Sequence, residues 1–124
     1  MKNRILIVDD EDDINLLFKK VLEDNGYKVD TFNDPLVALQ NFTAGSYDLL
    51  LLDMLMPKMN GFELYQKMIM LDDKVKICFL TASEVDQEEF RKKAAFTDAT
   101  EICFIIKPIE NKELIKRVRA LSLY

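Results

Sequence analysis

Histidine and tryptophan are absent from this 124-residue chain, and glycine, proline and cysteine are scarce. Without histidine, the chain cannot carry a histidine-based catalytic triad, a histidine-ligated zinc site or a phosphorylated histidine of its own. Any histidine chemistry must therefore come from a partner molecule. Three glycines and three prolines leave little room for a turn-rich all-β fold.

Basic residues are also in the minority, with 17 Lys and Arg against 22 Asp and Glu and a formal net charge of -5. This balance argues against direct contact with nucleic acid, which needs a clustered basic surface. The longest apolar runs have only the length of a strand, and the N-terminus lacks the pattern of a secretion signal. We therefore expect a cytoplasmic chain that contacts no membrane, folded as one domain over residues 1–124.

Short apolar runs alternate with segments of helical periodicity. The predicted strands are residues 5–8, 28–32, 49–52, 77–80 and 102–106. The predicted helices are residues 14–22, 34–42, 61–70 and 85–95, and a last one that Asn111 caps and that runs to Leu121. The two cysteines, Cys78 and Cys103, lie inside apolar runs, which favours buried reduced thiols over a redox or disulfide pair.

Five strands alternating with five helices predict an α/β fold with a doubly wound, mostly parallel sheet and right-handed crossovers. Only the strand at residues 28–32 alternates polar and apolar side chains, whereas the first and third strands are wholly apolar. Strands buried on both faces show such continuous apolar runs. The second strand is therefore expected at an edge, in the strand order 2-1-3-4-5.

Acidic residues follow the strands on both sides of the switch point of such a sheet. Asp9 and Asp10 come directly after the first strand and Asp53 closes the third, so their carboxylates should converge in one crevice. Neighbouring anions raise one another's pKa or hold a hard cation, and oxygen ligands suit Mg²⁺ or Mn²⁺. Thr81 and Lys107 end the fourth and fifth strands and add a hydroxyl and an ammonium group. Together these groups suit phosphoryl transfer.

Each of these residues also has a structural interpretation when taken alone. The acidic run that starts at Asp9 suits the N-terminus of a helix, Asp53 suits a loop, and Thr81 and Lys107 suit turns. All of them, however, fall at the carboxyl ends of predicted strands and none at the amino ends. This shared placement favours one functional site.

Four motifs, in this order and over nearly the whole chain, resemble the receiver domain of two-component response regulators. They are Ile5-Leu6-Ile7-Val8-Asp9-Asp10, Leu51-Leu52-Asp53-Met54-Leu55-Met56-Pro57 with Asn60-Gly61, Leu80-Thr81-Ala82 and Ile106-Lys107-Pro108. The resemblance implies a flavodoxin-like (βα)5 fold with Asp53 as the phosphoacceptor. Its phosphodonor would be the phosphohistidine of a sensor histidine kinase or a histidine phosphotransfer protein. Such a domain is a regulator, not an enzyme, apart from self-catalysed phosphorylation and dephosphorylation.

The resemblance also implies roles for the individual site residues. Asp10, Asp53 and the backbone carbonyl of Leu55 would ligate Mg²⁺, while Asp9 would act through a metal-bound water. Lys107 would pair with a phosphoryl oxygen. The family tends to hold the peptide bond that follows this lysine in cis, which would aim the lysine into the site.

Thr81 and Phe104 would form the switch in this family. Thr81 would hydrogen-bond another phosphoryl oxygen, and its movement would let the Phe104 ring turn from solvent-facing to buried. This turn would change the surface of the fourth helix, fifth strand and fifth helix, which a downstream protein would read. We expect the chain to be a monomer or a weak, phosphorylation-dependent dimer.

The chain departs from the family's pattern before and within the fifth strand. The usual Gly-Ala turn is missing, residues 96–101 lengthen that connection, and Phe104 stands where tyrosine is frequent. Beside the acceptor, Leu55 offers an apolar side chain that would hinder the hydrolytic water and prolong the phosphorylated state.

Three other functions remain as alternatives. A flavin carrier can share the strand order, but the acidic run at residues 9–13 would repel a phosphate group. A phosphatase with an aspartyl nucleophile commonly needs a second acid two residues on, where this chain has Leu55. A receiver-like binding module that is never phosphorylated would have no need of Asp53 together with Thr81 and Lys107.

Overall fold

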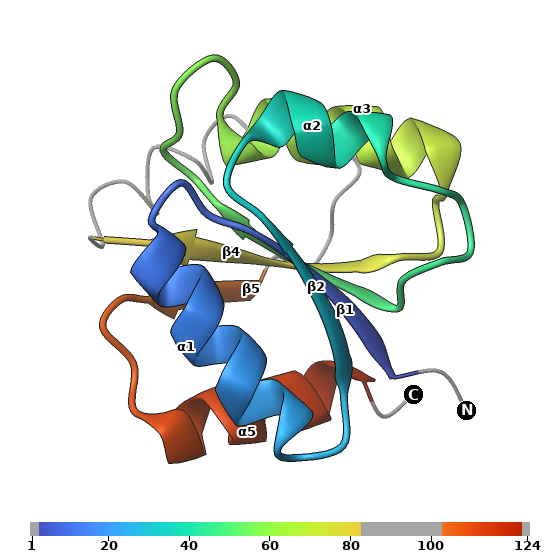
Figure 1. Cartoon of the computed structure of the whole chain (residues 1–124). Helices are drawn as coiled ribbons and strands as arrows, with labels where there is room; N and C mark the ends of the chain where they lie inside the picture. Colours follow the sequence, from blue (N-terminus) through green and yellow to red (C-terminus); the bar gives the residue numbers. More distant parts are fainter. Residues whose placement is uncertain (1–2, 83–102, 123–124) are drawn as a thin grey trace.

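The computed structural model describes residues 3–82 and 103–122, which form a parallel sheet with helices on both faces (Figure 1). The strands are β1 (Arg4–Val8), β2 (Lys28–Phe32), β3 (Leu49–Asp53), β4 (Lys76–Thr81) and β5 (Cys103–Ile106). The helices are α1 (Asp12–Glu23), α2 (Pro35–Gln40), α3 (Gly61–Leu71) and α5 (Asn111–Ser122). The strand order is β2-β1-β3-β4-β5 and every pair is parallel. The predicted order, with β2 at an edge, is confirmed.

Some of the sequence predictions differ from the structure or lie outside it. The predicted helix over residues 85–95 and the connection over residues 96–101 lie outside the described residues. Asn111 is the first residue of α5 and does not precede it, so it does not take the predicted capping position. In the described part of the chain, no helix is long and apolar enough to cross a bilayer.

The core lies on both faces of the sheet because successive side chains of a strand point to opposite sides. Leu6 and Leu50 belong to the cluster that contains the apolar side chains of α2 and α3. Ile5 and Leu49 belong to the cluster under α1 and α5. Figure 1 shows these two helix pairs on opposite sides of the sheet. This arrangement explains why β1 and β3 are almost wholly apolar in sequence.

Local sequence signals fix the starts of the two helices on the α2 and α3 face. Asp34 caps α2 by accepting hydrogen bonds from the backbone N–H groups of Leu36 and Val37, and a proline follows it directly. Asn60 and Glu63 form a reciprocal capping box at the start of α3. Both caps stand at the carboxyl edge of the sheet, where the predicted crevice lies.

The prediction of reduced thiols is wrong, because Cys78 and Cys103 form a disulfide bond between β4 and β5. The two residues are partners in the register of these adjacent strands, and their Cα atoms lie 4.5 Å apart. A disulfide can bridge that separation. Apolar flanking sequence indicates burial, but it contains no information on which residues the strand register places side by side.

Candidate functional site

Three carboxylates meet at the carboxyl edge of the sheet, between β1 and β3. Asp9 and Asp10 follow β1 and Asp53 is the last residue of β3, and these strands pair in register up to Val8 and Leu52. One oxygen of each acid lies within 4.8 Å of the others. The convergence expected from the sequence is therefore present, at the switch point of the strand order.

A cavity of about 240 Å³ opens above these acids. Its lining residues are Asp10, Glu11, Asp53, Met54, Leu55, Thr81, Ala82 and Lys107. The structure thus places Thr81, Leu55 and Lys107 around the same opening as Asp10 and Asp53. Asp9 is fully buried and does not line the cavity.

Lys107 supplies positive charge to this acidic site from the end of β5. Its Nζ donates a hydrogen bond to Asp9 Oδ2 at 3.0 Å and lies 3.6 Å from Asp53 Oδ1. The other oxygen of Asp9, Oδ1, accepts from the backbone N–H of Glu11 at 2.9 Å. Both oxygens of the buried Asp9 therefore have partners, as a buried carboxylate requires.

The acids and the lysine shift one another's protonation. Burial raises the pKa of Asp53 to about 7, and the nearby charges of Asp9 and Asp10 add to this effect against the pull of Lys107. Burial also raises the pKa of Asp9, although Glu11 and Lys107 oppose the rise. For Lys107, burial works to lower the pKa, but the contacts with Asp9 and Asp53 outweigh it and raise the pKa. Such crowding of anions is typical of sites that hold a cation.

The backbone around Asp53 is closely packed. The residue after it, Met54, donates its N–H to the Leu80 carbonyl at 2.9 Å and accepts from the Gly61 N–H at 3.0 Å. A Cβ atom on Gly61 would collide with the carbonyl group of Asp53, so α3 can start here only with glycine. On the other side of the site, the Lys107-Pro108 peptide bond is cis, as the resemblance implied.

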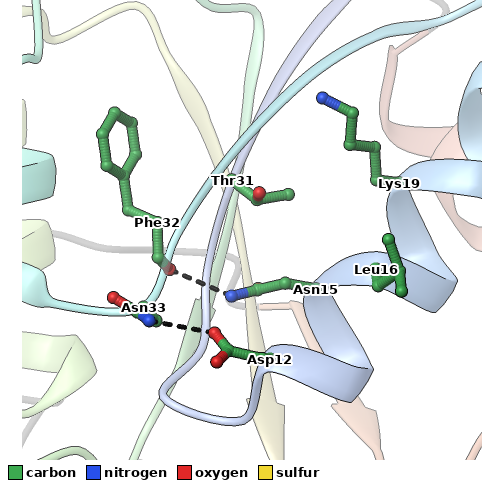
Figure 2. Close-up of a pocket in the computed structure, with 7 residues that line it drawn as sticks. All are labelled: Asp12, Asn15, Leu16, Lys19, Thr31, Phe32 and Asn33. Atoms are coloured by element: carbon green, nitrogen blue, oxygen red, sulfur yellow. Dashed lines mark hydrogen bonds between the residues drawn. The ribbon is translucent and has the colours of Figure 1, made fainter.

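Asn15 is a buried polar residue that the sequence analysis missed. Its side-chain amide donates to the carbonyl of Asp9 at 2.8 Å and to the carbonyl of Phe32 at 3.2 Å. It also lines a second cavity, of about 380 Å³ between α1 and β2, in which Figure 2 shows the bond to Phe32. The missed signal is its spacing, because Asn15, Phe18 and Leu22 share the apolar face of α1.

Phe104 does not reach the cavity. Its ring is 6% exposed and packs against Phe79, with the ring centroids 6.0 Å apart, in the core cluster under α2 and α3. The structure therefore describes the buried orientation of this ring. Thr81, the last residue of β4, is 1% exposed and lines the cavity. It also pairs in register with Ile106 of β5, the strand that carries Phe104, so Thr81 lies between the cavity and that strand.

Comparison with known proteins identifies the family. Residues 5–119 match the model of the response regulator receiver domain, and the chain belongs to this family. It is 32% identical over 121 residues to the response regulator MprA of Mycobacterium ulcerans, covering 98% of the chain and 50% of that protein. It is 29% identical over 120 residues to the transcriptional regulatory protein RprY of Bacteroides fragilis, covering 97% and 49%. The chain thus spans about half the length of these relatives.

Solved structures agree with this assignment and show a flavodoxin-like fold. The chemotaxis protein CheY4 of Vibrio cholerae superposes with a TM-score of 0.84 at 26% identity, over 98% of this chain and 99% of that one. The response regulator TrrA of Thermotoga maritima, solved in complex with Mg²⁺ and BeF, gives 0.80 at 34% identity, with the same coverage. The chain is therefore a receiver domain of the two-component response regulator family, whose members act in signalling.

Proposed function

We propose that Asp53 accepts a phosphoryl group from the phosphohistidine of a sensor histidine kinase or a histidine phosphotransfer protein. A carboxylate oxygen of Asp53 forms a bond to phosphorus as the P–N bond breaks, and the leaving imidazole keeps the electron pair and takes a proton from solvent. The observation that carries this proposal is the position of Asp53 in the cavity, with Lys107 Nζ 3.6 Å from its Oδ1. The chain has no histidine, so a phosphohistidine donor would have to belong to a partner.

The same acids fit a divalent cation such as Mg²⁺ or Mn²⁺. The donor set consists of oxygens alone, these oxygens lie within 4.8 Å of one another, and burial and neighbouring charge disfavour ionised Asp53 without a counter-charge. Asp10, Asp53 and the Leu55 carbonyl would hold the ion directly, and the buried Asp9 would act through a water. When bound, the cation would neutralise charge on the phosphoryl oxygens.

Addition of Mg²⁺ is expected to stabilise the protein. At about ten times the dissociation constant, a ligand that binds only the folded state adds about 1.4 kcal/mol to the free energy of unfolding. We expect the melting temperature to rise by a few degrees across millimolar Mg²⁺ at constant ionic strength, measured by differential scanning calorimetry. An unchanged melting temperature together with unchanged amide spectra would count against the metal site.

Lys107 and Thr81 would each contact one oxygen of the transferred phosphoryl group. The Lys107 ammonium would pair with one phosphoryl oxygen, in exchange for part of its present contact with Asp53. The Thr81 hydroxyl would hydrogen-bond another oxygen. Phe104 is already buried in this structure, so a movement of Thr81 toward the phosphoryl group would fix that orientation of the ring and restrict its turning toward solvent. A downstream protein would read the resulting surface of β5, α5 and the predicted helix over residues 85–95.

Thr81→Ala is expected to uncouple phosphorylation from this readout. The variant keeps Asp53 and the metal ligands, so it should still gain the phosphoryl group, but it lacks the hydroxyl that would follow the new anion. Amide chemical shifts with and without beryllofluoride provide the measurement, and most of the shift change over β5 and α5 should disappear. A wild-type pattern of shifts in Thr81→Ala would refute this mechanism.

Leu55 gives the acceptor an apolar neighbour. Its side chain is 61% exposed and lines the cavity next to Asp53. A water that attacks the phosphoryl group would have to pass this side chain, which offers it no hydrogen bond. We therefore expect a long-lived phosphorylated state. Leu55 also stands where an aspartyl phosphatase commonly has its second acid, which favours a regulator over such an enzyme.

In the wider context, we propose that residues 1–124 act as one receiver domain in the cytoplasm, as a monomer or a weak phosphorylation-dependent dimer. Its partners would be the phosphodonor and a downstream protein, without direct contact to nucleic acid or membrane. Catalysis would be limited to its own phosphorylation and dephosphorylation.

Intact-mass spectrometry tests the proposed function. With acetyl phosphate and Mg²⁺, the wild type should gain one phosphoryl group, and Asp53→Asn, which keeps the shape but lacks the nucleophile, should gain none. The matched control Asp73→Asn removes an exposed carboxylate that precedes the amino end of β4, at the opposite edge of the sheet from the site, and should behave like the wild type. Equal labelling of Asp53→Asn would assign the acceptor to another residue.

A further inference from the structure

The loop that follows Asp53 contains a residue in an unfavourable backbone conformation. Lys58 has a φ of 73°, and it is the one non-glycine residue with positive φ in the part of the chain that the structure describes. Left-handed backbone costs free energy for any residue with a Cβ atom, whereas glycine adopts it freely. The contacts of the Lys58 side chain are therefore where a compensating gain is to be sought.

The side chain of Lys58 reaches across to the start of α2. Its Nζ donates a hydrogen bond to Asp34 Oδ2 at 2.7 Å. The other oxygen, Oδ1, caps α2 through the N–H of Leu36 at 2.8 Å and of Val37 at 3.4 Å. The hydrogen bond from Lys58 and the cap lower the pKa of Asp34, so the carboxylate stays ionised at neutral pH. One carboxylate thus joins the β2–α2 turn to the β3–α3 loop.

The same loop forms one wall of the candidate site. Leu55, three residues before Lys58, lines the cavity. The loop is fixed on its other side by Met59, which is 8% exposed in the core and donates its N–H to the Pro57 carbonyl at 2.8 Å. Between Leu55 and Met59, Met56 packs partly against the core, and Lys58 adds the ion pair to Asp34.

We propose that Asp34 and Lys58 are positioning residues, which hold the loop of residues 54–60 so that the Leu55 carbonyl faces the cation and the transferred phosphoryl group. This proposal rests on the proposed function of Asp53 and adds residues outside the cavity to it. Groups that orient a metal ligand from outside contribute measurably to metal affinity. The left-handed conformation of Lys58 is then the cost of placing a charged anchor at this point.

The affinity for Mg²⁺ distinguishes positioning from a general charge effect. Loss of a positive charge in Lys58→Met should strengthen cation binding by simple electrostatics, and loss of a negative charge in Asp34→Asn should weaken it. Positioning instead predicts that both variants bind Mg²⁺ about two- to fivefold more weakly, the range expected for an exposed ion pair. Asparagine retains the ability to cap α2, so Asp34→Asn keeps the helix.

The experiment is a Mg²⁺ titration of the metal-free full chain, followed by amide chemical shifts. The double variant should bind no more weakly than either single variant, since one interaction is lost in all three. Lys58→Arg, which keeps the charge, should restore wild-type affinity, and Lys67→Met, an equal charge change on the exposed face of α3, should not weaken binding. Lys58→Gly relieves the backbone conformation but lacks the anchor, and it should bind as weakly as Lys58→Met.

Tighter binding by Lys58→Met, or wild-type affinity in both single variants, would overturn the positioning role. The proposed function would survive that outcome if the wild type still binds Mg²⁺ and gains the phosphoryl group. A wild type that binds no Mg²⁺ would overturn both.

Discussion

In the absence of divalent metal, Asp53→Asn should be more stable than the wild type at pH 8, by roughly 2–4 kcal/mol in the free energy of unfolding. Asp53 is buried, and its pKa is raised to about 7 from the usual 3.8, chiefly by burial and then by the charge of Asp9. Above this pH the folded protein must hold the ionised carboxylate beside its neighbours, whereas the unfolded chain ionises freely. The asparagine side chain of Asp53→Asn keeps the shape of the carboxylate but has no charge to bury, so this free-energy cost is absent.

The sign of the pH dependence follows from the direction of the shift. Between about pH 4 and 7 the folded state binds a proton at Asp53 that the unfolded state has released, so wild-type stability falls as the pH rises through this window and levels off above it. Urea unfolding in EDTA at pH 5 and pH 8 measures the effect, with Asp73→Asn as control. The advantage of Asp53→Asn should shrink toward pH 5 and when Mg²⁺ is added to both proteins. A variant less stable than the wild type at pH 8 would contradict this account.

Lys107→Ala should have the opposite effect, a loss of about 3–5 kcal/mol at pH 8 without metal. The substitution leaves Asp9, which is fully buried, without the cation 3.0 Å from its Oδ2, and it also removes the positive charge near Asp53. Protonation of the acids relieves this penalty, so the loss should be smaller at pH 5. Added Mg²⁺ should restore part of the stability.

The matched control is Lys112→Ala, which removes an exposed lysine in the first turn of α5, shortly after Lys107 in the sequence. Urea unfolding of the two variants at both pH values separates the contact with the acids from a general change in charge. Equal, small losses for Lys107→Ala and Lys112→Ala would show that Lys107 does not balance the buried acids.

The fold could be predicted because its signals are local. The apolar run at residues 49–52 reports burial on both faces, the alternation at residues 28–32 reports an edge, and each strand is followed by a helical pattern. The site followed from the same pattern, since parallel strands place their carboxyl ends along one edge. The sequence alone therefore predicted that Asp9, Asp53 and Lys107 lie close together.

Features that depend on register or on loop conformation could not be predicted. Asn15 bonds to the Phe32 carbonyl because of how α1 lies on the end of β2, and Cys78 meets Cys103 because of the register of β4 and β5. The depth of Asp9 below Asp10 also depends on how the chain turns after β1. The ion pair of Lys58 has no signal in the local sequence, because its partner Asp34 lies 24 positions earlier in the chain.

The most direct test of the central claim is the chemical location of the phosphoryl group on the wild-type chain. An aspartyl phosphate is an acyl phosphate, and borohydride reduces it to homoserine, which peptide mass spectrometry can place in the sequence. After incubation with acetyl phosphate and Mg²⁺, we predict homoserine at position 53 alone, and none when EDTA replaces Mg²⁺. Homoserine at Asp9, at Asp10 or elsewhere, or no homoserine in a chain that binds Mg²⁺, would contradict the assignment of Asp53 as the phosphoacceptor.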